Sequence, residues 1–144
     1  MESKTLFRET IKAGALGDSQ RAVELNSRIP EEERDDFNDH VSAVFCAAVE
    51  NRLREDHSLP AIKEFVNEFR YDFREADPPV KVLVAEALIR VFYGEEHLID
   101  EIDGAEQIRH QLMIIRKIVD QSQSIKNQLD EFLIEAQKLT EAED

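Results

Sequence analysis

The stretch GAEQIRHQLMIIRKIVDQSQSIKNQLDEFLIEAQKLTEAED, residues 104–144, decides the fold class of this chain. After Gly104 it runs for forty residues without a proline or a glycine, and apolar residues recur in it at helical spacing. Two columns repeat every seven residues: Ile108, Ile115, Ser122, Leu129 and Ala136 form the first, and Ile118, Ile125, Phe132 and Leu139 form the second. These columns predict helix over 105–140, with a seam like that of a coiled coil.

The middle of this stretch, Asp120-Gln121-Ser122-Gln123-Ser124, is polar and contains modest helix formers. Two structures fit it: one long helix, with 122–140 projecting as a dimer seam, or a helical hairpin folded at this polar point. A tight hairpin usually carries a glycine or a proline, and none is present. The continuous or slightly kinked helix is therefore the favoured prediction, and the hairpin remains open.

Proline and glycine divide the rest of the chain into further helical segments. Pro30 before three glutamates predicts the start of a helix that ends near Asp56. Ser58 predicts the cap of the next helix, and Asp77 before two prolines predicts another start. Asp103 to Glu106 has the spacing of a capping box. No segment alternates convincingly with period two, so the predicted class is all-α.

The segment 80–93 is apolar on nearly every side, interrupted by Lys81, Glu86 and Arg90. A helix that is hydrophobic all round is normally buried among others. We therefore expect a single all-α domain over 1–144, a compact bundle of about six helices around a buried central helix at 80–93. The same segment is too short to cross a bilayer.

A local resemblance concerns the N-terminal region. Ala15-Leu16-Gly17-Asp18-Ser19-Gln20-Arg21-Ala22, followed by Pro30, resembles the turn and second helix of a tetratricopeptide unit. No second copy follows at the period of that family. The resemblance implies an αα-hairpin here, with its turn at Gly17.

Charge and composition exclude several classes of function. The net charge is −14, from 18 Lys plus Arg against 32 Asp plus Glu, and a field of this sign repels nucleic acid and anionic membranes. Direct nucleic-acid binding and membrane association are therefore disfavoured. The N-terminus lacks the apolar region of a secretory signal, and Cys46 is the single cysteine. A reducing cytoplasm is the expected location.

No motif in the chain supplies a catalytic chemistry, a metal site or a cofactor site. The best metal candidate is the run 95–101, where His97 shares a helical face with Asp100 and Glu101. A solvated acidic turn is the favoured interpretation because no second histidine lies at ligand spacing. We therefore expect no enzyme activity, no cofactor and no metal, and we expect Cys46 to be a core thiol.

The favoured functional prediction is an adaptor or assembly module that binds another protein, or itself as a homodimer, through the apolar seam of the C-terminal helix. The expected partner-binding residues are the apolar anchors and a basic strip beside them: Ile125, Leu129, Phe132, Leu139, Arg109, Arg116 and Lys117. For the strip taken alone, the favoured interpretation is intramolecular, with its cations paired to glutamates of a neighbouring helix. The alternative is an acidic inhibitor or immunity-type protein, whose carboxylates at 31–36 and 95–103 imitate nucleic acid and occupy a nucleic-acid-binding protein. Monomer and dimer both remain open.

Overall fold

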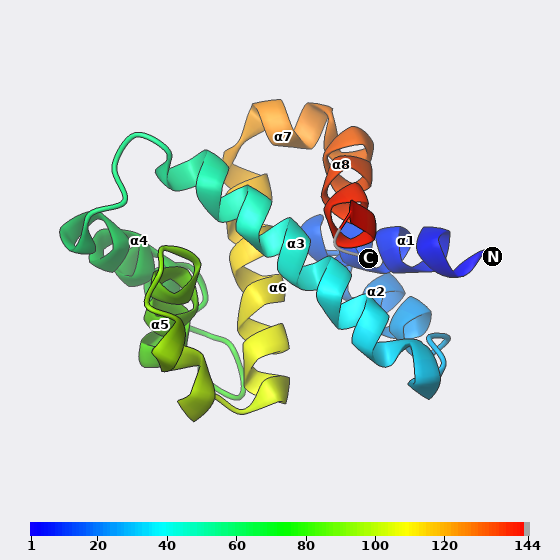
Figure 1. Ribbon diagram of the computed structural model, residues 1–144, viewed down its shortest axis with the longest axis horizontal. Helices are drawn as coiled ribbons and strands as arrows, with labels where there is room; N and C mark the ends of the chain where they lie inside the picture. The colour runs from blue at the N-terminus through cyan, green and yellow to red at the C-terminus, as the bar shows by residue number, and fades with distance from the viewer. Residues whose placement is uncertain (143–144) are drawn as a thin grey trace.

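The computed structural model describes residues 1–142, and their regular structure is entirely helical (Figure 1). Two 3-10 segments, η1 (Glu31–Glu33) and η2 (Glu96–Glu101), precede α3 and α6. The α-helices are α1 (Ser3–Ala15), α2 (Ser19–Asn26), α3 (Arg34–Leu53), α4 (Leu59–Asp72), α5 (Val82–Phe92), α6 (Gly104–Gln121), α7 (Gln123–Asn127) and α8 (Leu129–Ala142). The predicted all-α class is confirmed.

Two helix starts follow the capping signals of the sequence. The Ser58 hydroxyl accepts a hydrogen bond from the Ala61 N–H at 3.3 Å, and the Asp103 carboxylate accepts one from the Glu106 N–H at 3.4 Å. The start predicted after Asp77 is wrong. The chain bends at Asp77 and Pro78 and is not helical before Val82, where α5 begins; Lys81, just before it, is extended with φ −104° and ψ 104°.

The N-terminal αα-hairpin is confirmed. Gly17 forms the turn between α1 and α2 with a φ of 77°, a left-handed conformation that glycine adopts without steric cost. The Asp18 side chain then accepts a hydrogen bond from the Arg21 N–H at 3.2 Å and caps α2.

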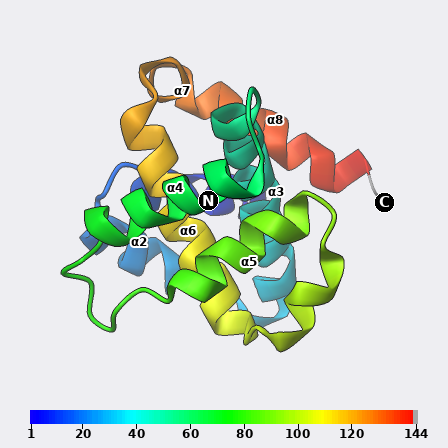
Figure 2. The same ribbon diagram turned by 90° about the vertical axis from the view of Figure 1, so that its left-hand side faces the viewer.

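The core lies where α3 crosses α6 (Figure 1). α3 buries one face over almost its whole length, from Phe37 to Leu53, and α6 buries Ile114, Ile115, Ile118 and Val119 against it. α1 packs on α6, and α8 packs on α3 and α1. α4 and α5 lie together on the opposite side of α6, as Figure 2 also shows.

The helix expected to be central and buried on all sides, 80–93, is buried on one face only. Ala85, Leu88 and Ile89 are enclosed, whereas Leu83 is 80% exposed. The reason is position: α5 packs on α4, α6 and η2 at one side of the molecule. α3 and α6 form the centre of the core.

The favoured prediction of a continuous or slightly kinked C-terminal helix is wrong, because the helix ends before Ser122. This residue is extended, with φ −119° and ψ 101°, and its hydroxyl accepts a hydrogen bond from the Ile125 N–H at 3.2 Å. Ser122 therefore ends α6 and caps α7, without a glycine or a proline. The chain turns here, and α8 lies against α3 and α1 instead of projecting (Figure 1).

Candidate interaction groove

The apolar seam predicted for the C-terminal segment is divided between core and surface. Ile125 and Leu129 are 4% and 5% exposed and belong to the core, and Phe132 is half-buried against it. Leu139 is 56% exposed. The helix breaks at Ser122 and again at Gln128, and Ile125 and Leu129 face inward, so the four residues do not form one continuous surface.

Lys117, expected on the surface, is a buried cation that holds α4 to α6. Its side chain is fully enclosed, and its ammonium group lies 2.5 Å from an Asp72 carboxylate oxygen and 3.4 Å from one of Glu68. It also lies 5.3 Å from the centroid of the Phe65 ring. Lys117 therefore agrees with the interpretation in which the basic strip pairs with acidic residues of the same chain.

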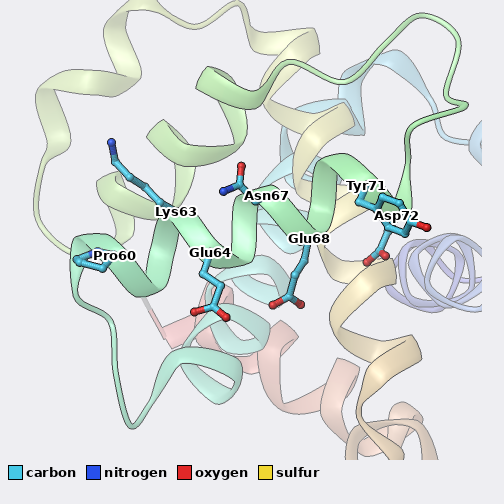
Figure 3. A pocket seen from close by; sticks show the side chains of 7 residues that line it. All are labelled: Pro60, Lys63, Glu64, Asn67, Glu68, Tyr71 and Asp72. Carbon is cyan, nitrogen blue, oxygen red and sulfur yellow. The ribbon is translucent and has the colours of Figure 1, made fainter.

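One side of α4 presents an acidic row at i, i+4 and i+8. Figure 3 shows Glu64, Glu68 and Asp72 on one side of the helix, with Lys63 and Asn67 on the other. Glu68 also pairs with Arg52 of α3 at 3.0 Å. Glu68 and Asp72 therefore form intramolecular ion pairs that connect α4 to α3 and α6.

Arg109 and Arg116, the other two predicted cations, lie along an open groove. Four helices line it: α1, α2, the start of α3, and α6. Its volume is about 670 Å³, within the range of ligand-binding clefts. Thr10 and Phe37 are buried and form its floor.

The walls of the groove are apolar. α6 contributes Ala105, Ile108, Leu112 and Met113 at helical spacing, so that one face of its first three turns is turned to the groove. Opposite, α2 contributes Val23, which is 70% exposed. A valine at that exposure leaves apolar surface in contact with water, and a bound protein could cover this surface.

The charged residues among those described as lining the groove are three arginines, Arg34, Arg109 and Arg116. Acidic residues outnumber basic ones 32 to 18 in the whole chain, so this local excess of positive charge opposes the general trend. The groove is therefore an apolar channel with a cationic rim.

The three guanidinium groups are held to different degrees. Arg34 donates to the Asn26 side-chain oxygen at 2.8 Å and lies 5.5 Å from the Phe37 ring centroid. Arg109 donates to the carbonyl oxygens of Pro78 and Pro79 and lies 3.8 Å from Glu106. These contacts orient the side chains and leave further donor N–H groups.

Arg116 is the least engaged of the three. Its guanidinium lies 5.7 Å from the Phe73 ring centroid and against Gly17, where a Cβ would come within 3.1 Å of the terminal nitrogen. It forms no hydrogen bond or ion pair with any residue that the structure describes. A guanidinium positioned by packing and lacking a counter-charge is a ready partner for a carboxylate.

Other candidates have structural roles. Cys46 is half-buried beside the core, as expected of a core thiol. His40 and His110 are buried, and burial lowers the pKa of each imidazole below 6.5. Over residues 1–142, no group of three or more His, Cys, Asp or Glu side chains is arranged to hold a metal ion, the run 95–101 included.

Sequence reasoning found two of the three arginines but missed the opposite wall. The available signal was in α2, where Val23 and Leu25 are two positions apart and therefore point to nearly opposite sides of the helix. Leu25 is buried, so Val23 had to face outward. Arg34 and Phe37 join the groove only because α3 passes beneath it, which no local pattern indicates.

None of the helices in the described part of the chain combines the length and apolar character needed to span a membrane. Comparisons with protein-family models, curated proteins and solved structures gave no match to this chain.

Proposed function

We propose that this chain is a non-enzymatic helical domain that acts by binding another protein, and that the groove between α2 and α6 is its binding surface. The observation that carries the proposal is the open apolar groove, with the exposed Val23 on one side and the half-buried Ile108 and Leu112 on the other, inside a rim of arginines. Apolar anchors surrounded by charged residues are the usual composition of a protein-binding surface.

This proposal keeps the C-terminal segment in the interface but moves the contact within it. The predicted seam relied on Ile125 and Leu129, and both are occupied by intramolecular packing. The face of α6 that carries Ile108, Arg109, Leu112 and Arg116 is the part of that segment left available. Leu139 lies outside the groove and is a secondary contact at most.

The acidic inhibitor remains the second candidate, favoured by one observation. Glu31, Glu32, Asp35 and Asp36 are exposed together at the entry to α3. Such a surface could occupy the basic site of a nucleic-acid-binding protein. Binding of that kind would weaken steeply with salt, because exposed charge pairs are screened.

Affinity capture with matched variants tests the proposed function. The bait proteins are the wild type, Val23→Glu in the groove, and Leu83→Glu on α5 as a control at another exposed apolar residue. Proteins from nuclease-treated lysate are bound and then eluted by a salt gradient. The expected result is a partner retained by the wild type and by Leu83→Glu but lost by Val23→Glu.

Two results would contradict it. A partner retained equally by all three baits, and released early in the salt gradient, would favour the acidic inhibitor. Specific capture lost only in Leu83→Glu would move the binding surface to α5.

A further inference from the structure

We propose that the groove binds an amphipathic α-helix of a partner protein whose flanks carry acidic residues. This inference rests on the proposed function and specifies the chemistry of the partner. It depends on three properties of the groove: its length, its apolar pattern and the sign of its rim.

The length of the groove suits a helix. The α6 residues that line it run from Gly104 to Arg116, which at 1.5 Å per residue is a wall of about 18 Å, or a little over three helical turns. Both the α6 wall and the α2 wall have exposed rims, at Arg116 and Val23. A partner helix could therefore lie along the channel and leave its polar side in water.

The apolar pattern of the wall matches the spacing of a docked helix. Ala105, Ile108 and Leu112 recur at three and four residues, which gives a stripe along α6. Recognition of a helix in a groove uses apolar anchors at the same spacing on the partner. Leucine or isoleucine side chains on the partner would fill the channel above Phe37.

The sign of the rim selects the flanks of the partner. Arg109 and Arg116 are seven residues apart on one helix, so they lie about 10.5 Å apart along its axis on nearly the same side. Glutamates seven apart on a parallel or antiparallel partner helix would face both. Arg34, from α3, completes the rim.

Long-range charge gives this pairing an unusual salt dependence. The chain as a whole carries −14 and repels an acidic partner at a distance, while the rim attracts it at contact. Raising ionic strength from about 0.01 M to about 0.15 M shortens the Debye length from roughly 30 Å to roughly 8 Å, which removes long-range repulsion more than contact pairing. The affinity for an acidic helix should therefore stay constant or rise over this interval, whereas the binding of an acidic inhibitor to a basic protein should fall.

The test is selection from a displayed library of helical peptides in which both the apolar and the flanking positions are randomised. The chain contains no tryptophan, so a tryptophan built into each selected peptide reports binding by fluorescence without background from the protein. Targets are the wild type, the groove variants Val23→Glu and Arg116→Glu, and the controls Leu83→Glu and Arg70→Glu. Arg116→Gln repeats the charge test if Arg116→Glu fails to fold, as judged by circular dichroism.

The expected result is enrichment of peptides with an apolar face and Asp or Glu flanks. These peptides should bind both controls like the wild type and lose about tenfold or more in affinity for each groove variant. Enriched peptides with Lys or Arg flanks, or a steep loss of affinity between about 0.01 M and about 0.15 M salt, would overturn the inference.

Other outcomes separate this inference from the proposed function. Peptides that bind both groove variants like the wild type but do not bind Leu83→Glu would show that the groove is not the binding surface. The proposed function, a protein-binding domain, would remain. No enrichment on any target would overturn the partner helix, and the proposed function would then be judged by the lysate capture.

Discussion

At the scale of single residues, the hydrogen bonds of the buried His110 favour the neutral form of its imidazole. Its Nε2 accepts a hydrogen bond from the Lys81 N–H at 2.9 Å, so the neutral ring carries its proton on Nδ1 and donates to the Glu106 carbonyl oxygen at 2.9 Å. A second proton on Nε2 would point at the Lys81 N–H and break this hydrogen bond. Burial is the main reason that the pKa of His110 lies below 6.5.

This arrangement predicts a loss of stability in acid. The unfolded chain takes up a proton near pH 6.5 and the folded chain only at lower pH, so the contribution of His110 is complete above that value and is lost as the pH falls through the folded pKa. In His110→Gln, the amide oxygen can accept from Lys81 without titrating. We expect chemical denaturation to show a smaller difference between about pH 7.5 and about pH 5 in this variant than in the wild type.

His40 contributes a slope of the same sign, because burial lowers its pKa as well. The effect of His110 is therefore the difference between wild type and variant, not the whole pH dependence. The exposed His97→Gln serves as the matched control. Equal slopes in the wild type and His110→Gln would show that the Lys81 hydrogen bond does not select the neutral ring.

The buried Lys117 predicts an asymmetry between the two sides of its ion pair. Lys117→Met leaves Glu68 and Asp72, which still reach solvent, and it fills an apolar site, so we expect a change within about 1 kcal/mol. Removing both carboxylates in Glu68→Gln/Asp72→Asn leaves a buried cation without counter-charge, and we expect a loss of about 3 kcal/mol. Urea denaturation at constant pH measures both.

Combining the three substitutions is the control for this prediction. Lys117→Met added to the double variant removes the uncompensated cation and should recover most of the lost stability. A triple variant no more stable than the double variant would show that the carboxylates stabilise α4 independently of Lys117.

At the scale of elements, the sequence predicts structure best where the signal is local. Ser58 and Asp103 each cap a helix through a bond to the residue three positions later, and both starts were predicted. Ser122 uses the same bond, but the absence of glycine and proline around it favoured a continuous helix. The polar run marked the right place, and only the packing of α8 on α3 explains why the chain turns there.

Because the C-terminal segment is not one continuous helix, substitutions at two leucines of the predicted seam should have different effects on stability. Leu129 lies in the core at 5% exposure, so Leu129→Glu buries a charge and should cost at least about 3 kcal/mol. Leu139 is 56% exposed, so Leu139→Glu should change stability by no more than about 0.5 kcal/mol. Urea denaturation followed by circular dichroism compares the two with the wild type.

The size of each variant in solution completes this comparison. If Leu129→Glu kept wild-type stability while abolishing self-association, the seam would be an interface between copies and not part of the core.

At the scale of the whole molecule, the groove could be predicted only in part, because it belongs to four helices at once. Arg109 and Arg116 were visible as an aligned pair on one segment. Val23, Arg34 and Phe37 join them through the path of α1, α2 and α3, and that path depends on burial across the whole core. Periodicity shows which face of a helix is apolar, but not which apolar residues remain without a neighbour.

The arrangement of the helices predicts uneven stability across the molecule. α3 and α6 form the central crossing, with α1 and α8 packed on it, whereas α4 and α5 pack on each other, on η2 and on one side of α6 (Figures 1 and 2). Elements with fewer enclosing neighbours open at lower free energy than the core. The buried residues of α5, Ala85, Leu88 and Ile89, should therefore become accessible before those of α3.

Native-state hydrogen exchange measures this directly. Amides of α4 and α5 should open as one unit, with protection about tenfold or more below that of central α3 amides such as Val44 and Val49. Asp72→Asn, which weakens the hold of Lys117 on α4, should lower protection in α4 and α5 and leave α1 and α3 unchanged. Exchange of α3, α4 and α5 at a single common free energy would mean that the crossing and its flanking pair unfold together, and that the Lys117 pair stabilises the whole molecule equally.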